Sequence, residues 1–225
     1  MADHLPLAHR YPGMPTFRRE RYRFYTLLLR NFYRLFYKAK VHNLERVPSA
    51  GPLLMIANHQ THFDPPFVGC WLPRGMWFLA RESLFGPFGL GSFLKSVNAI
   101  PLKRGESDTV AIRKALDVLS RGGGVVMFPE GTRSPDGDVQ EFQRGISLLL
   151  KRAKCPVLPV GISGLHDAWP RGKASPNLFS GARFHVNYGY SIHPEELLKD
   201  GPESALRKLR EQVIALKQEV EQGGV

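Results

Sequence analysis

The sequence predicts an α/β fold in which helices flank a largely parallel sheet. Apolar runs of strand length alternate with segments of helical periodicity, as in strands connected through helices. The 225 residues, 43% hydrophobic and 23% charged, suffice for one domain with a sizeable core and exclude a wholly disordered chain. The predicted strands are Leu53–Ala57, Met76–Ala80, Ala99–Leu102, Gly124–Phe128, Val157–Ile162 and Arg183–Tyr188. Helical patterns fall between several of them, at Pro65–Trp71, Thr109–Leu119 and Phe142–Ala153.

The first predicted element is a basic helix within residues 17–40. This segment has eight Lys and Arg against one acid, a net charge of +7 out of the chain's +11. Apolar side chains recur in it at steps of three and four, which defines one face of a helix. They are Tyr25, Leu28, Leu29, Phe32, Leu35 and Phe36. Arg30 and Arg34 interrupt the apolar run far short of the roughly 18–20 residues that a membrane span needs.

Three interpretations of this helix stay open. It packs on its own domain, it lies on a membrane surface with its basic side chains on anionic head groups, or it binds nucleic acid. Nucleic acid is the weakest, because no zinc-finger, helix-turn-helix or single-strand-binding signature accompanies it. We therefore expect no nucleic-acid partner, no transmembrane span, and a peripheral position on an anionic membrane surface.

The first loop suited to chemistry follows the strand Leu53–Ala57 and reads Asn58-His59-Gln60-Thr61-His62-Phe63-Asp64. A histidine exchanges protons near neutral pH, so His59 is a candidate general base, although a structural loop histidine is an equal alternative. Asp64 lies close enough across a tight turn to accept from its far ring nitrogen. Asp64 before Pro65 also suits a helix start, and one carboxylate can fill both roles.

A metal site is a further interpretation of this loop. His59, His62 and Asp64 are all potential ligands, but their spacing matches no zinc signature. Cys70 and Cys155 fit no structural zinc pattern either, and two cysteines are too few for a disulfide scaffold. We therefore predict no metal, and free thiols in a reducing compartment.

The second such loop follows the strand Gly124–Phe128 and reads Pro129-Glu130-Gly131-Thr132-Arg133-Ser134. Glycine lets the backbone approach a ligand closely, and an arginine fork suits phosphate. Lys103 and Arg104 end another strand, so cations can gather at one edge of the sheet. A phosphate-bearing substrate is the ligand that this charge favours, and a plain surface turn is the alternative.

Several catalytic motifs are absent from the sequence. It has no G-x-S-x-G nucleophile elbow, no Walker loop and no G-x-G-x-x-G motif. A general base without a protein nucleophile fits direct transfer onto a substrate hydroxyl that the base deprotonates.

The last predicted element is an amphipathic helix that packs on the domain. Its apolar positions follow the spacing 3-4-3-4, which is helical. They are Leu206, Leu209, Val213, Leu216 and Val220. With no internal repeat or low-complexity linker, we divide the chain into an N-terminal helical element, residues 1–42, and one domain, residues 43–225.

Together these motifs resemble those of the glycerolipid acyltransferases. His59 and Asp64 match the family's H-x-x-x-x-D signature, and residues 128–134 match its F-P-E-G-T-R-S block in full. Residues 157–160 resemble the fourth block, and residues 99–104 stand in the place of the second. The blocks come in the family's order, and the lysophosphatidic acid acyltransferases are the most similar group.

The resemblance implies a twisted, mostly parallel sheet flanked by helices, as in glycerol-3-phosphate acyltransferases. It implies that His59 deprotonates the acceptor hydroxyl while Asp64 orients it, and that the oxygen attacks the thioester of acyl-CoA or acyl carrier protein. No metal or cofactor is then required, and the N-terminal segment stands where bacterial members can carry a membrane-embedded helical pair. The residues implied to hold the acceptor's phosphate and glycerol are Glu130, Gly131, Thr132, Arg133 and Arg104, and the strand-end charge of Lys103 adds it to the expected acceptor contacts.

The expected protein is therefore an acyltransferase that converts lysophosphatidic acid to phosphatidic acid in phospholipid biosynthesis, on the cytoplasmic side of the cell membrane. The second block departs from the family pattern at three positions. Asn98 replaces the family's glycine, Pro101 replaces an aromatic residue and Lys103 replaces an acid. Another acceptor, such as a different lysophospholipid, a lyso-ornithine lipid or a glycolipid, stays open. A non-catalytic lipid- or nucleic-acid-binding protein is the third hypothesis, which the intact His59, Asp64 and Glu130 disfavour.

Overall fold

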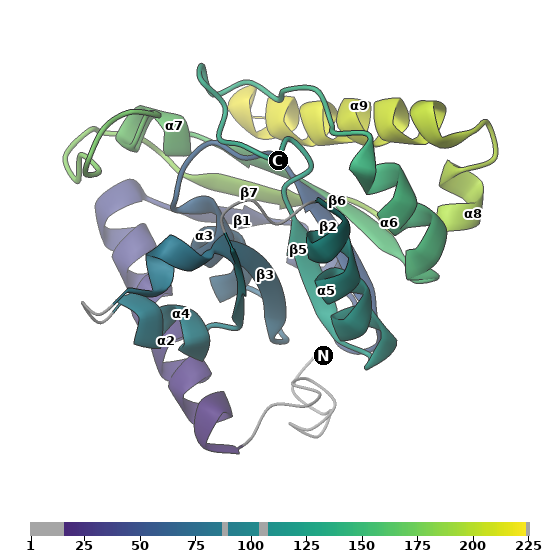
Figure 1. The fold of residues 1–225 in the computed structure, drawn as a ribbon. Helices are drawn as coiled ribbons and strands as arrows, with labels where there is room; N and C mark the ends of the chain where they lie inside the picture. Colours follow the sequence, from purple (N-terminus) through teal and green to yellow (C-terminus); the bar gives the residue numbers. More distant parts are fainter. Residues whose placement is uncertain (1–15, 87–89, 104–107, 224–225) are drawn as a thin grey trace.

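The computed structural model describes residues 16–86, 90–103 and 108–223 (Figure 1). Seven strands in this part of the chain form one sheet, in the order β1-β7-β6-β2-β5-β3-β4. Neighbouring strands run parallel except β6 and β7, which are antiparallel. The strands are β1 (Lys40–His42), β2 (Leu53–Ala57), β3 (Met76–Arg81), β4 (Ala99–Leu102), β5 (Gly124–Met127), β6 (Val157–Ser163) and β7 (His185–Tyr188). The predicted α/β fold with a mostly parallel sheet is confirmed.

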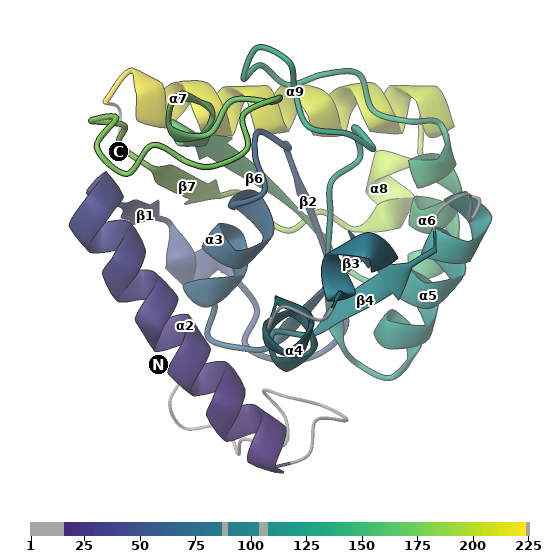
Figure 2. The same cartoon turned by 60° about the vertical axis from the view of Figure 1, so that its left-hand side comes forward.

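Helices cover both faces of the sheet (Figures 1 and 2). One face packs against α2 (Thr16–Tyr37) and α3 (Asp64–Cys70), with α4 (Leu90–Ser96) beside them. The other packs against α5 (Asp108–Ser120), α6 (Gly145–Ala153) and α9 (Pro202–Glu221). The remaining short helices are α7 (Leu165–Ala168), α8 (Pro194–Leu197) and the single 3₁₀ turns Leu44–Arg46 and Glu82–Phe85.

The central position of β2 in the sheet explains why its sequence is apolar throughout. Leu53, Met55 and Ala57 join the core on the α2 face, while Leu54 and Ile56 join the core on the α9 face. All five are fully buried. A strand covered on both faces has no solvent side, so it needs no polar alternation.

Two elements differ from those predicted from the sequence. β1 has only three residues, two of them polar, and it forms the edge of the sheet by pairing in parallel with β7. The predicted N-terminal element therefore contributes its last residues to the sheet of the predicted domain. The predicted helix Phe142–Ala153 begins only at Gly145, because the backbone N–H of Gln143 donates to Pro129 O (2.9 Å) and keeps the preceding chain in a loop.

The predicted N-terminal helix is present as α2, but the predicted apolar face is not its buried face. Its buried side chains are Tyr22, Thr26, Tyr33 and Tyr37. Leu28 and Leu35 point outward, and Tyr25, Leu29, Phe32 and Phe36 are only partly buried. Tyrosines make the contact because the rings pack while the hydroxyls reach carbonyls, Tyr33 to Phe63 O and Tyr37 to Asn177 O, both at 3.4 Å.

Packing of α2 on its own domain is thus confirmed, and an outward apolar face remains. The outward residues are Phe24, Leu27, Leu28 and Leu35, which are 56–76% exposed. Nowhere in residues 16–86, 90–103 and 108–223 is there a helix with the length and apolarity to cross a bilayer.

Candidate active site

His59 lies directly beyond the carboxyl end of β2, and Asp64 begins α3. His59 Nδ1 and Asp64 Oδ2 are 2.7 Å apart. Because an ionised carboxylate only accepts hydrogen bonds, Nδ1 carries the proton and Nε2 keeps its lone pair. The described residues offer Nε2 no hydrogen-bond partner, and the His59 side chain is 19% exposed. This arrangement would suit a general base that acts through Nε2.

Asp64 is completely buried and holds the loop as well as the histidine. Its Oδ2 also accepts from the backbone N–H groups of Gln60 and Thr61, at 2.5 and 2.8 Å, and its Oδ1 accepts from the Thr61 hydroxyl at 3.1 Å. Pro65 occupies the first turn of α3, as the sequence suggested. Helix α3 does begin at Asp64, but Phe63 occupies the N-cap and the Asp64 carboxylate accepts from the preceding loop, so of its two predicted roles the structure shows the contact with His59 and not the cap.

Two buried amides fix the residues on either side of His59. Asn58 exchanges two hydrogen bonds with the backbone of Ile162 in β6, at 3.0 and 2.8 Å. Gln60 donates to Gly137 O at 2.7 Å and accepts from the Leu165 N–H at 3.1 Å. Neither residue was predicted as part of the site. The only sequence signal was a pair of amides directly after an apolar strand.

The F-P-E-G-T-R-S block follows β5, the strand paired with β2, and its residues contact His59. Glu130 Oε1 accepts from the His59 N–H at 2.9 Å, and the Ser134 N–H donates to His59 O at 2.7 Å. The Phe128 ring stacks on the imidazole with centroids 4.4 Å apart. The two motifs, about seventy residues apart in sequence, thus form one unit around the histidine.

Glu130 faces inward, toward the loop that carries His59. It is 4% exposed, and its Oε2 is buried with no hydrogen-bond partner among the residues described. Burial raises the pKa of Glu130 from 4.5 to about 7, and the charge of Asp64 adds to the rise. The backbone amides of His59 and Gln140 and the charge of Arg210 act in the opposite direction. The sequence assigned Glu130 to the acceptor, and the structure gives it a contact with His59.

We predict that Glu130→Gln changes how stability depends on pH. The folded pKa of Glu130 exceeds the unfolded value, so ionising this carboxyl costs folding free energy as pH rises from about 5 to 8. The glutamine carbonyl can still accept from His59 N–H and carries no charge. The variant should match wild type near pH 5 and exceed it at pH 8 by up to about 3 kcal/mol in urea unfolding. A stability difference that stays constant between those pH values contradicts the prediction.

The backbone conformation of residue 131 and the atoms around it both require glycine. Its φ is +71°, and a Cβ at this position would lie 2.2 Å from Nε2 of Gln143. Gln143 in turn donates to Glu130 O at 3.3 Å, so the loop and the segment before α6 are packed against each other. A side chain at residue 131 would separate them.

Cationic side chains gather near Arg133, including two that were not predicted. Burial and the charges of Arg171 and Arg81 lower the pKa of Arg133, and Arg171 Nη1 donates to Arg133 O at 3.3 Å. Arg81 ends β3, a strand-end position that the sequence rule used for Lys103 would also have found.

The other predicted acceptor residues are less closely placed. Thr132 is exposed beside Arg133. Lys103 is exposed just beyond β4. Like His59 it follows the carboxyl end of a strand, but β4 lies three strands from β2 in the sheet, which is about 14 Å at ordinary strand spacing. Arg104 lies outside the described residues.

The departures in the second block leave the backbone intact. Asn98 has φ +64°, the left-handed conformation for which glycine is favoured, and asparagine tolerates it better than most residues. Pro101 lies in β4, an edge strand, where a missing N–H is tolerated. The substitutions at these two positions therefore preserve the local fold.

A metal site at the histidine loop was the alternative interpretation, and the side chains of this loop do not form a ligand set. The His62 ring packs against Trp169, with centroids 5.3 Å apart, while His59 Nδ1 binds Asp64. Across residues 16–86, 90–103 and 108–223, no three His, Cys, Asp or Glu side chains cluster in a way that could hold a metal ion.

The C-terminal helix α9 holds the chain that follows the second motif. Arg210 donates to Val139 O and Gln140 O, at 2.9 and 3.0 Å. Further along α9, the Nζ of Lys217 lies 3.1 Å from the Oδ1 of Asp138. The segment between Arg133 and α6 is therefore fixed from outside by α9, which the sequence predicted only as a packing helix.

Comparison with known proteins agrees with this geometry. A protein-family model described as Acyltransferase matches residues 38–163. The chloroplastic 1-acyl-sn-glycerol-3-phosphate acyltransferase of Brassica napus is 29% identical over 140 residues, 61% of this chain and 40% of that protein. The enzyme of the same name from Streptococcus pneumoniae is 25% identical over 190 residues, 82% of this chain and 68% of that protein.

A solved structure extends the similarity to the whole fold. The crystal structure of the 1-acyl-sn-glycerophosphate (LPA) acyltransferase from Thermotoga maritima matches with a TM-score of 0.74 and 26% identity, covering 91% of this chain and 79% of that one. The present chain spans less than half the length of the Brassica napus relative. The family model covers more than half of the chain and includes both motifs around His59. The chain belongs to the acyltransferase family.

Proposed function

We propose that this protein transfers a fatty acyl group from a thioester to the free hydroxyl of lysophosphatidic acid, giving phosphatidic acid for phospholipid synthesis. The observation that carries the proposal is the contact of His59 Nδ1 with the buried Asp64, which presents Nε2 as a base. The relatives named above support the acceptor, since their names specify 1-acylglycerol phosphates. The donor is acyl-CoA or acyl carrier protein.

The proposed reaction is a direct transfer. His59 Nε2 takes the proton of the acceptor hydroxyl as its oxygen attacks the thioester carbonyl carbon. The C–O bond forms, the C–S bond breaks, and the departing thiolate takes the proton from the imidazolium. Asp64 stabilises the imidazolium while it exists, and Glu130 and Ser134 hold the His59 backbone in place. The residues supply all of these steps, so we propose no metal or cofactor.

The acceptor's phosphate is assigned to the cationic edge of the site. Arg133 lies in the motif that clamps His59, and Arg81 and Arg171 are near enough for their charges to act on it. Thr132, Gly131, Lys103 and Arg104 remain proposed acceptor contacts. A phosphate placed here would bring a glycerol hydroxyl toward His59.

Arg133→Ala tests the phosphate assignment. We expect its KM for lysophosphatidic acid to rise about 10- to 100-fold, the value of a lost charge-assisted contact, with little change for monoacylglycerol, which has no phosphate. The measurement is product mass across a panel of lyso-lipids with acyl-CoA and acyl carrier protein donors. Arg152→Ala, an exposed arginine at the end of α6, is the matched control.

The panel also decides between acceptors. Equal losses on lysophosphatidic acid and monoacylglycerol would contradict a phosphate contact at Arg133. Wild-type preference for a lyso-ornithine lipid or glycolipid would replace the proposed acceptor, an alternative that Lys103 keeps open because the family has an acid at this position.

We also propose that the protein acts at an anionic membrane surface through residues 17–40. The outward apolar face of α2 is flanked by Arg23 and Arg34, which suits a helix lying in the interface. The acceptor is itself a membrane lipid. We place the reaction on the cytoplasmic side, which suits the free thiols of Cys70 and Cys155.

A further inference from the structure

A second apolar element stands beside α2. The loop of residues 169–183, between α7 and β7, carries Phe179, which at 88% exposure is the most exposed large hydrophobic residue described. The loop has three basic residues, Arg171, Lys173 and Arg183, and no acid. An aromatic side chain held in water among basic neighbours is a feature of surfaces that bind something both apolar and anionic.

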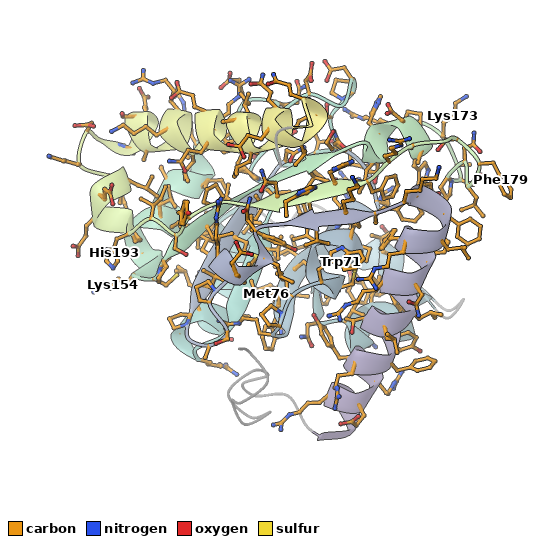
Figure 3. All side chains as sticks on the ribbon, turned by 180° about the vertical axis from the view of Figure 1, so that it is seen from behind. Trp71, Met76, Lys154, Lys173, Phe179 and His193 are labelled. Carbon is orange, nitrogen blue, oxygen red and sulfur yellow. The ribbon has the colours of Figure 1, made fainter. Side chains whose placement is uncertain are left out.

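The loop is fixed against the C-terminal end of α2. The Phe179 and Phe36 rings are 6.4 Å apart, and the Tyr37 hydroxyl donates to Asn177 O at 3.4 Å. Leu178 packs against the core, so Phe179 is turned outward while its neighbour is held. Figure 3 shows Phe179 and Lys173 at the outer margin of the molecule, on the side where α2 lies.

This position makes one surface of two segments that are far apart in sequence. The outward face of α2 contributes Phe24, Leu27, Leu28 and Leu35, and Phe36 connects it to Phe179. The basic flank of the helix includes Arg34 and Lys38, and Lys173 extends the positive charge onto the loop. In Figure 2, α2 and the loop occupy the same side of the molecule.

The same loop touches both catalytic motifs. Trp169 packs against His62 and Phe63 of the histidine loop, with ring centroids 5.3 and 5.0 Å apart. Arg171 donates to the backbone carbonyl of Arg133 in the second motif. Trp169 and Arg171 lie within about ten residues of Phe179 in the sequence. The surface therefore continues to the carboxyl end of β2, where His59 lies.

We infer that the 169–183 loop is a second lipid-contacting element, with Phe179 inserted into the bilayer beside the outward face of α2. Two adjacent contacts, one from α2 and one from the loop, seat His59 and Arg133 toward the anionic surface from which the acceptor comes. The inference rests on the proposed function, because it assumes a lipid acceptor. A second copy of this chain does not fit the surface, since it would oppose the loop's three positive charges with three more.

The test uses a labelled cysteine at the proposed insertion point. Cys70 and Cys155 are 1% exposed, so Phe179→Cys can be labelled selectively with a polarity-sensitive dye. Tyr190→Cys is the matched control, because Tyr190 is also an exposed aromatic and lies just beyond β7, at the opposite edge of the sheet from His59. We expect the dye at position 179 to shift to the blue on vesicles of phosphatidylcholine with about one-third phosphatidylglycerol, and the dye at 190 to stay unshifted.

Vesicle binding of unlabelled variants gives the second readout. Phe179→Ser should weaken sedimentation with these vesicles about three- to tenfold, as expected for one partly buried aromatic ring, while Tyr190→Ser matches wild type. Both should retain wild-type acylation of a short-chain lysophosphatidic acid dissolved in water. Position 179 unshifted on vesicles that wild type binds, or equal binding by Phe179→Ser, overturns the inference. So does a blue shift without vesicles that grows with protein concentration, which would show self-association.

These outcomes separate the inference from the function on which it rests. Failure of wild type to acylate the dissolved acceptor would contradict the proposed function. Failure of wild type to bind vesicles would contradict the membrane role of α2 and the loop together. Normal acylation and vesicle binding, with no effect at Phe179, would contradict the loop alone.

Discussion

Replacement of His59 by alanine is expected to lower kcat for acyl transfer by about two to four orders of magnitude, the usual loss when a general base is removed. The imidazole has the buried carboxylate of Asp64 at one ring nitrogen and a free lone pair at the other. The folded state should persist, because the loop's backbone hydrogen bonds to Glu130 and Ser134 do not use the ring. The measurement is single-turnover acylation with a thermal unfolding scan of the same sample.

His62→Ala is the matched control for this prediction. His62 lies in the same loop but packs against Trp169 and has no carboxylate partner at hydrogen-bond distance among the residues described. Burial and the charge of Arg133 lower its pKa, which makes it mostly neutral at pH 7. We expect a loss below about tenfold, against the much larger loss at His59. Comparable losses in the two variants would mean that the base has been assigned to the wrong histidine.

Asp64→Asn is expected to lower kcat by on the order of 10²–10⁴-fold while leaving the fold largely stable. An asparagine oxygen in the place of Oδ2 can still accept from His59 and from the backbone of Thr61, and its amide can donate to the Thr61 hydroxyl. What is lost is the negative charge that stabilises the imidazolium. Charge and geometry are therefore separated by this substitution.

Asp64→Ala completes the comparison, because it removes the hydrogen bonds together with the charge. It should lower the free energy of unfolding by about 1–3 kcal/mol for each buried N–H left unpaired, and activity with it. Urea unfolding of the two variants, with kcat for each, distinguishes the effects. Near-normal kcat in Asp64→Asn would reduce Asp64 to a helix-starting residue.

The sequence predicted best what depends on local pattern. β2 and β5 were found because strands buried on both faces are apolar throughout. His59 and Asp64 were found because a tight turn brings residues five apart into contact. β1 was not found, because it is held by pairing with the distant strand β7, and the ring of His42 meets that of His185, 143 positions away. Periodicity carries no information about such a partner.

The buried face of α2 shows a different limit. The apolar face predicted from periodicity contained Leu35 and left out Tyr33 and Tyr37, yet these two tyrosines are completely buried and Leu35 is 76% exposed. The reason is the surface that α2 meets, which provides aromatic rings and carbonyl groups together, as Phe184 does in stacking 4.0 Å from Tyr37. Asn58 was overlooked for a similar reason, because its partner Ile162 is 104 residues away.

The hold of α9 on residues 138–140 has a consequence for synthesis of the chain. Translation delivers both catalytic motifs well before α9, so a ribosome-bound chain ending near residue 200 already contains His59 and Glu130. It lacks the guanidinium of Arg210 and the ammonium of Lys217 that cap the carbonyls and carboxylate of the intervening loop. Domains generally fold as units once their sequence is complete. The loop between Arg133 and α6 therefore gains its full set of contacts only after α9 has been synthesised and packed, well after both motifs around His59 have been made.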